Sequence, residues 1–261
     1  MNKILIIGKK SFLGSNLKIH LSKNFYVDIY SFEQIILKKI SFFNKYTHVI
    51  NASIHPKYIN KKYEKKFDLD AKFILKFKEI NFFYIFLNSR KIYLQKDKIT
   101  ERSELKPNSI YAKNKLITEK YLQKIIKKKL ISLRISNVLG NRLFKNGRTN
   151  HKIFLDNYLK LKKKSFLVVN NDFKDFITID QFCEMVNKII EKNLHGIFNV
   201  SLGKKVLISE IIKWIDEKFY EKIKFTNIQS DSFTLSNKKL LKKIRIRITK
   251  KQVETFCKKL M

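Results

Sequence analysis

The sequence predicts an α/β protein built around a parallel, doubly wound sheet. Short apolar runs alternate with amphipathic stretches from the first residue onward. The apolar runs, such as Lys3–Ile7 and Asn81–Leu87, are continuous rather than alternating with polar residues. Such runs are typical of strands buried on both faces, and helical patterns between them indicate crossover connections.

The composition indicates a globular protein with one large domain, or one domain with a small lobe. A chain of 261 residues can bury a full core. No apolar run approaches the roughly 20 residues that cross a bilayer. The two cysteines, Cys183 and Cys257, have no metal-like spacing. We therefore expect a cytoplasmic protein with no membrane segment and no bound metal.

The formal net charge of +35 would ordinarily suggest a polyanionic partner. Lysine, isoleucine and asparagine are abundant here, whereas glycine, proline and alanine are scarce, as AT-rich coding would produce. The lysines are also spread along the chain rather than gathered on one element. We interpret the charge as compositional, and keep a nucleic-acid-associated protein as a minor alternative.

The first apolar run leads directly into a glycine turn and a helical pattern. This order of strand, turn and helix is the context of a phosphate-binding turn. Gly8 permits the tight turn, and Gly14 lets helix and strand pack closely. Backbone N–H groups of Ser11, Phe12 and Leu13, at the helix start, would face a pyrophosphate. An ordinary turn between strand and helix is the alternative.

The second strand is expected at Phe25–Tyr30. In dinucleotide-binding folds, an acidic residue near the end of this strand binds the ribose hydroxyls. Ser31 stands in that neighbourhood, and Glu33 follows two residues later. This pattern leaves the choice between NAD and NADP open, with NADP slightly favoured.

Two further strands end in polar residues. The third, His48–Ser53, is followed by a polar stretch and then by a helix expected at Tyr63–Phe77. The central strand, Asn81–Leu87, ends in Asn88 and Ser89. A serine at a strand end is commonly a turn residue, but its hydroxyl can also hold a substrate oxygen.

A helix expected from Asn108 to about Lys127 places Tyr111 and Lys115 on one face. A fixed ammonium beside a phenol favours the phenolate, which suits proton transfer near neutral pH. The spacing alone is weak, because it recurs at Tyr58/Lys62, Tyr158/Lys162 and Tyr220/Lys224. Only Tyr111 follows an apolar strand that ends in a hydroxyl residue.

These segments, in this order, resemble those of the extended short-chain dehydrogenase/reductase family. The turn resembles Gly-x-x-Gly-x-x-Gly with Ser11 at the middle glycine. The third strand resembles Val-Ile-Asn-Ala-Ala, and Asn88–Tyr93 resembles Ser-Ser-x-x-Val-Tyr. The resemblance implies a Rossmann-type fold and NAD or NADP as cofactor. The cofactor would also contact Asn51, Ala52, Ser53, Tyr111 and Lys115.

The resemblance also implies a reaction on a nucleotide-linked sugar. Ser89 would orient the substrate oxygen, Tyr111 would move the proton, and Lys115 would support Tyr111. A strand at Leu130–Ser136 leads into a segment similar to Leu-Arg-x-x-Asn-Val-x-Gly, whose asparagine, here Asn137, meets the substrate diphosphate. Lys174 stands where the family has an arginine that grips a substrate phosphate.

The two residues after Ser89 limit the reaction. Family members that eliminate water from a hexose have an Asp-Glu pair there, whereas this chain has Arg90 and Lys91. The prediction is therefore an epimerase or a reductase rather than a 4,6-dehydratase. Because Ser11 and Lys174 depart from the family pattern, a cofactor-binding protein with little catalysis is the main alternative.

By resemblance, residues 1–136 plus about 178–200 would form the NAD(P)-binding domain, and residues 137–177 and 201–261 a small, mostly helical substrate lobe. A homodimer through two packed helices, as is common in the family, stays open. Asp180 is expected to cap the helix at its position, and Thr249 with Gln252 forms a capping-box pattern. Further helices are expected at 150–162, 182–192 and 208–219.

Overall fold

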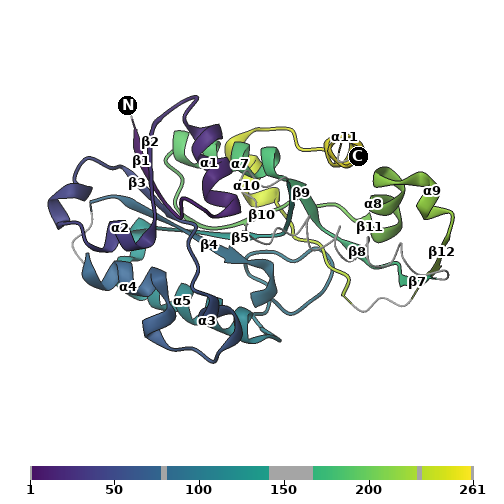
Figure 1. Cartoon of the computed structure of the whole chain (residues 1–261), viewed down its shortest axis with the longest axis horizontal. Coiled ribbons are helices and arrows are strands. Elements are labelled where there is room, and N and C mark those ends of the chain that lie inside the picture. The colour runs from purple at the N-terminus through teal and green to yellow at the C-terminus, as the bar shows by residue number, and fades with distance from the viewer. Residues whose placement is uncertain (1, 78–80, 141–166, 228–230, 260–261) are drawn as a thin grey trace.

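The centre of the molecule is a sheet of six strands, in the order β10-β5-β4-β3-β1-β2 (Figure 1). The computed structural model describes residues 2–77, 81–140, 167–227 and 231–259. Every pairing in this sheet is parallel, so the predicted doubly wound α/β fold is confirmed. The strands are β1 (Lys3–Ile7), β2 (Tyr26–Tyr30), β3 (His48–Asn51), β4 (Phe83–Ser89), β5 (Leu130–Ile135) and β10 (Gly196–Val200).

Helices cover both faces of the sheet (Figure 1). Side chains of a strand point alternately to its two faces. Ile4 and Ile6 therefore enter the core under α1 and α7, while Leu5 and Ile7 enter the core under α4 and α5. This double burial explains why the strands are continuous apolar runs. The covering helices are α1 (Phe12–Leu21), α2 (Phe32–Ile36), α4 (Leu69–Lys76), α5 (Ile110–Ile126) and α7 (Ile179–Glu191).

The winding of the chain reverses at β1, because β2 lies on one side of it and β3 on the other. In such sheets the ligand crevice lies outside the carboxyl ends of the strands at the reversal. Gly8 follows β1 with φ +119°, and a Cβ there would lie 2.9 Å from the carbonyl carbon of Ala52, just after β3. The two strand exits approach this closely only because residue 8 is glycine.

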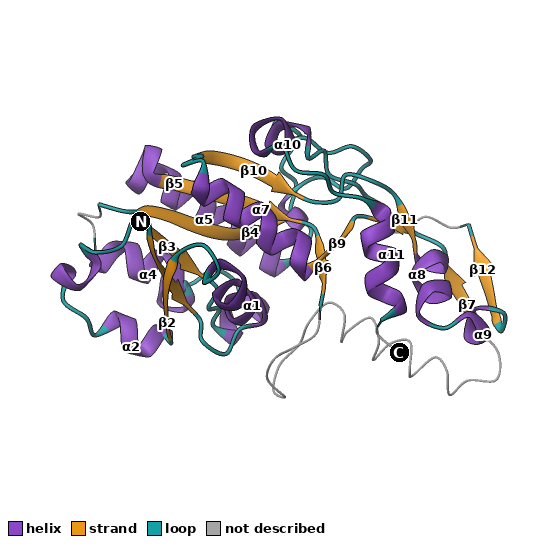
Figure 2. Cartoon of the chain, turned by 90° about the horizontal axis from the view of Figure 1, so that it is seen from above, coloured by secondary structure: helices purple, strands orange, loops and turns teal. Residues whose placement is uncertain are grey.

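A second group of elements lies beyond one end of the sheet (Figures 1 and 2). It contains three two-stranded pairings, β6 with β9, β8 with β11, and β7 with β12. The elements are β6 (Asn137–Leu139), β7 (Leu167–Asn170), β8 (Phe173–Lys174), β9 (Phe176–Thr178), β11 (Val206–Leu207), β12 (Ile223–Thr226), α8 (Ile208–Ile215), α9 (Glu217–Tyr220) and α11 (Lys250–Lys258). No helix in the described ranges is long and apolar enough to cross a membrane.

Helix boundaries differ from the predictions where side chains cap the backbone. The helix predicted from Tyr63 begins at Leu69, because Asp68 accepts a hydrogen bond from the N–H of Ala71 at 3.0 Å. The helix predicted over 208–219 is broken at Asp216, which caps α9. The predicted cap at Asp180 is wrong, because the Thr178 side chain caps α7.

Several short elements were not predicted. They include α3 (Pro56–Asn60), α10 (Lys238–Ile244) and the 3-10 turns η1 (Ile40–Phe43), η2 (Lys65–Phe67), η3 (Arg90–Ile92) and η4 (Lys127–Lys129). Strand ends shift by one or two residues, as for β4, which begins at Phe83 and runs to Ser89. The capping box of Thr249 and Gln252 is confirmed at α11. The predicted helix at 150–162 lies outside the described residues.

Candidate active site

The glycine turn after β1 leads into α1 and provides its N-cap residue, Ser11. Ser11 Oγ accepts a hydrogen bond from the N–H of Gly14 at 2.9 Å. Ser11 has an ordinary φ of −80°, so a serine at this place introduces no backbone strain. A Cβ on Gly14 would lie 2.6 Å from both Gly8 O and Ser11 Oγ. Phe12 and Leu13 donate their N–H groups to no described residue, and these groups stay available for an anion.

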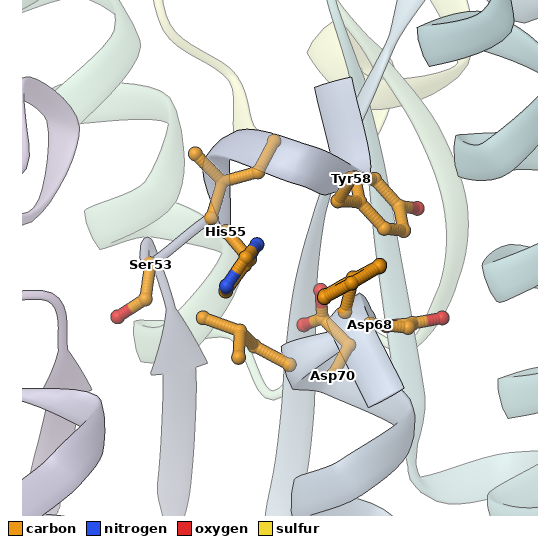
Figure 3. A pocket seen from close by; sticks show the side chains of 8 residues that line it. Ser53, His55, Tyr58, Asp68 and Asp70 are labelled. Carbon is orange, nitrogen blue, oxygen red and sulfur yellow. The ribbon is translucent and has the colours of Figure 1, made fainter. Parts of the chain in front are cut away.

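The exit of β3 is held by the buried side chain of Asn51. Its Nδ2 donates to Asp70 Oδ1 at 2.9 Å, and its Oδ1 accepts from the Ser53 N–H at 3.0 Å. Asn51 therefore fixes the backbone of Ala52 and Ser53 against Gly8. A shallow pocket adjoins this exit, and Ser53, His55, Tyr58, Asp68 and Asp70 line it (Figure 3).

Helix α5 brings Tyr111 and Lys115 to the strand that carries Ser89. The Ser109 side chain caps the helix by accepting from Ala112 N–H at 3.3 Å. One turn later, the buried Lys115 ammonium donates to the carbonyl oxygen of Leu87 at 2.9 Å. Leu87 lies two residues before Ser89 in β4, so this hydrogen bond ties the lysine to the end of the strand.

The environment of Ser89 and Tyr111 leaves both hydroxyl groups accessible to a ligand. Ser89 Oγ accepts only a long hydrogen bond of 3.3 Å from the Lys91 N–H. The Tyr111 hydroxyl is partly exposed and bonds to no residue in the described ranges. Helix α5 packs against both β4 and η3, the turn that Ser89 caps. Helix α5, which carries Tyr111 and Lys115, thus packs against the end of β4 that carries Ser89.

A buried polar network lies beneath this helix, and sequence reasoning missed it. Asp70 Oδ1 accepts from Tyr84 OH at 2.7 Å as well as from Asn51. Asp68 Oδ2 accepts from Thr118 Oγ1 at 2.6 Å, and Thr118 accepts from Tyr58 OH at 2.6 Å. The only signal in the sequence is a pair of aspartates at the start of a helix that buries Phe73 and Ile74.

Burial raises the pKa of Asp70 to about 6, although the Lys115 ammonium acts in the opposite direction. This value lies above the unfolded pKa of about 3.9. The folded state therefore binds the proton more tightly than the unfolded state does. The resulting stabilisation is complete below about pH 4 and is lost as the pH rises through 6.

We expect Asp70→Asn to remove this pH dependence. Asparagine keeps an oxygen for the Asn51 and Tyr84 donors but cannot ionise. The difference in unfolding free energy between variant and wild type should change by about 2 kcal/mol between pH 4 and pH 7, in favour of the variant at pH 7. Urea unfolding at several pH values measures this difference. A difference that is constant with pH would contradict the buried titration.

The predicted substrate residues reach the same end of the sheet. Asn137 directly follows β5 and Ser136, and its N–H donates to the Asp175 carbonyl at 3.2 Å. Lys174, the neighbour of Asp175, forms an ion pair with Asp231 at 2.7 Å. The same carboxylate pairs with Arg90 at 3.4 Å. Lys174 is thereby linked to the residue that follows Ser89.

Three buried polar atoms near the exits of β3 and β4 have no hydrogen-bond partner within the described ranges. They are Ser53 Oγ, Asn88 Nδ2 and Arg90 Nε. Buried polar groups normally form hydrogen bonds, so an atom without a partner requires an explanation. A polar ligand at the carboxyl ends of these strands would provide one.

The other Tyr-x-x-x-Lys pairs lie in different surroundings. The Tyr58 hydroxyl is buried and bonded to Thr118. Tyr220 lies on α9, where its ring contacts Phe225. Tyr158 lies outside the described residues. Among the Tyr-x-x-x-Lys pairs that the structure describes, only Tyr111 combines an accessible hydroxyl with a lysine anchored to β4.

Comparison with known proteins identifies one matching family and several solved structures of similar fold. The model of the NAD dependent epimerase/dehydratase family matches residues 57–201, more than half of the 261 residues. No curated protein sequence matches this chain.

Three solved structures of similar fold cover nearly the whole chain. One is a dTDP-4-dehydrorhamnose reductase ortholog from Clostridium acetobutylicum, with 19% identity, a TM-score of 0.76 and 99% of each chain covered. Another is UDP-glucose 4-epimerase from Thermotoga maritima with UDP-glucose, with 17% identity, a TM-score of 0.76, and 98% of this chain and 96% of that chain covered. The third is UDP-N-acetylglucosamine 4-epimerase from Methanobrevibacter ruminantium, with 18% identity, a TM-score of 0.75, and again 98% and 96% covered.

Proposed function

Because the chain belongs to the NAD dependent epimerase/dehydratase family, we propose that it is an NAD(P)-dependent epimerase or reductase of a nucleotide-linked sugar. The observation that supports this most is the hydrogen bond from the Lys115 ammonium to Leu87 O at 2.9 Å. It draws Tyr111 and Lys115 of α5 to the strand end that carries Ser89. A hydroxyl, a phenol and an anchored ammonium then share one end of the sheet.

The glycine turn fits a dinucleotide. Side chains at Gly8 and Gly14 would fill the space between the turn and the exit of β3, and the unpaired N–H groups of Phe12 and Leu13 suit a pyrophosphate. The cofactor would lie over Ala52 and Ser53. When bound, it supplies hydride exchange with a carbon of the sugar. The family favours NAD, against the slight preference for NADP drawn from Ser31, whose hydroxyl caps α2.

The remaining chemistry belongs to side chains of this chain. Tyr111 gives or takes the proton of the sugar oxygen, and Ser89 Oγ holds that oxygen. Lys115 holds a fixed positive charge one helical turn from Tyr111 and supports its proton transfer. Asn137 and Lys174 hold the substrate diphosphate.

The choice of reaction rests on Arg90 and Lys91. The family includes dehydratases, which need carboxyl groups to remove and deliver protons during loss of water. In this chain both positions after Ser89 are basic, and the Arg90 guanidinium lies 3.6 Å from the centre of the Phe233 ring. Redox and proton transfer are the reactions that the assembled side chains support.

A cofactor-binding protein with little catalysis is the second candidate. The ion pair of Lys174 with Asp231 favours it, because a lysine already paired at 2.7 Å competes with its own carboxylate for substrate phosphate. Lysine also lacks the two-pronged contact of arginine.

Native mass spectrometry followed by a turnover assay distinguishes the candidates. The purified protein should carry NAD or gain it on addition. With UDP-glucose or UDP-N-acetylglucosamine it should then yield an epimer, or oxidise NADPH or NADH with the 4-keto sugar. Bound cofactor without conversion of any nucleotide sugar would favour the second candidate. A chain that binds neither NAD nor NADP would contradict both.

A further inference from the structure

Three cations surround one carboxylate beside Ser89. We call Arg90, Lys91, Lys174 and Asp231 the cationic cluster. Arg90 and Lys91 directly follow Ser89 in the chain, whereas Lys174 arrives from β8 and Asp231 from the segment that follows β12. Asp231 pairs with Lys174 at 2.7 Å and with Arg90 at 3.4 Å. One carboxylate therefore pairs with two cations, and Lys91 has no ion-pair partner among the described residues.

The hydrogen-bond donors of Arg90 are only partly used within this cluster. Its side chain is 10% exposed, and its guanidinium stacks on Phe233. All three of its contacts with Asp231 are long, at 3.4 Å, and its Nε has no hydrogen-bond partner in the part of the chain that the structure describes. A buried guanidinium normally forms short, paired contacts with carboxylate oxygens. Arg90 thus keeps donor capacity for another anion.

Lys91 is the exposed cation of the cluster. No described carboxylate forms an ion pair with it. Partial burial of its ammonium, and after it the positive charges of Arg90 and Lys174, lower the pKa of Lys91, while the Asp231 carboxylate acts in the opposite direction. An anion brought to this place would relieve that repulsion.

The neighbouring acids are engaged with backbone groups. Asp172 accepts from the Asp231 N–H at 3.1 Å and so holds the backbone of that residue. Asp175 is fully buried, and accepts from three backbone N–H groups, those of Leu202, Gly203 and Leu235. Burial raises the pKa of Asp175 to about 7, so near neutral pH it carries only part of its charge. The cluster keeps its positive excess.

We propose that Arg90 and Lys91 bind a carboxylate carried by the sugar itself, so that the substrate is a nucleotide-linked acidic sugar such as a hexuronate. This inference rests on the proposed function. The diphosphate is the alternative anionic group. The position favours the sugar, because both cations adjoin Ser89, the residue assigned to the reacting sugar oxygen, while Asn137 and Lys174 are assigned to the diphosphate.

The test compares two ligands that differ only in the group at C6. Calorimetric titration of the NAD-loaded protein with UDP-glucuronate and with UDP-glucose should give at least about tenfold tighter binding of the uronate. Lys91→Gln should remove most of that preference and leave the UDP-glucose affinity near its original value. Lys96→Gln, which removes an exposed lysine five residues later, is the matched control and should keep the preference.

Each other result would overturn the inference in a distinct way. Equal affinity of wild type for the two ligands would mean that the cluster does not read the sugar. Equal loss of both ligands in Lys91→Gln would assign the cluster to the shared diphosphate. Both results leave the proposed function intact. Binding of neither nucleotide sugar by NAD-loaded protein would overturn the proposed function together with the inference.

Discussion

Replacing Tyr111 with phenylalanine should lower turnover of the nucleotide sugar about 100- to 10,000-fold. The substitution removes one oxygen, which is the atom proposed to exchange the proton with the sugar. The hydroxyl bonds to no residue that the structure describes, so its loss should leave the fold unchanged. NAD affinity should change little, because the glycine turn and the exit of β3 provide most of the proposed cofactor contacts.

The matched control is Tyr220→Phe. This tyrosine has a lysine at the same spacing but lies on α9, outside the six-stranded sheet. Turnover of each variant at saturating substrate and its NAD affinity by titration provide the comparison. Full activity of the Tyr111 variant would remove the proposed mechanism. Equal losses in the two variants would indicate a general structural effect.

Replacing Glu119 with alanine should lower the free energy of unfolding by about 3–5 kcal/mol. Its carboxylate accepts two hydrogen bonds from Arg134, at 3.1 and 2.7 Å, and a third from Ser132 Oγ. Glu119 is 1% exposed and Arg134 3% exposed, so water cannot replace the lost partner. The substitution would leave a guanidinium charge buried between α5 and β5.

The surface residue Glu254 provides the control for this effect. It also contacts two cations, Lys251 and Lys258, but both ion pairs lie on the exposed side of α11. Glu254→Gln should unfold at nearly the wild-type denaturant concentration, since exposed ion pairs contribute little. Equal destabilisation of the two variants in urea would show that burial does not set the strength of the Glu119 interaction.

The parts of this fold that the sequence predicts depend on local patterns. The glycine turn, the buried strands and the placing of Tyr111 one turn before Lys115 all follow from neighbouring residues. The alternation of strands and helices then fixes the fold class, because parallel strands need crossovers. Context also selects Tyr111 among several tyrosines with the same spacing.

The parts that could not be predicted depend on contacts between distant residues. Asp231 is 141 residues from Arg90, and no sequence pattern near either residue predicts their ion pair. The strands β7 and β12 are four residues each and gain their pairing only in the folded chain. The buried roles of Asp68 and Asp70 depend on donors from α5 and β4. Such pairings set the charge around the site, so the sequence alone left the substrate open.

The buried Lys115 ammonium, held by a main-chain carbonyl, and the exposed lysines should respond differently to salt. Dissolved ions weaken attractions across water but hardly reach a charge enclosed by protein. Dozens of solvent-facing lysines attract an anionic sugar nucleotide, so its rate of binding should fall as ionic strength rises. The buried Lys115 ammonium would act on the Tyr111 phenol to nearly the same degree at low and at high salt concentration. Salt would therefore govern how often the reaction begins, and leave the rate of the committed step almost untouched.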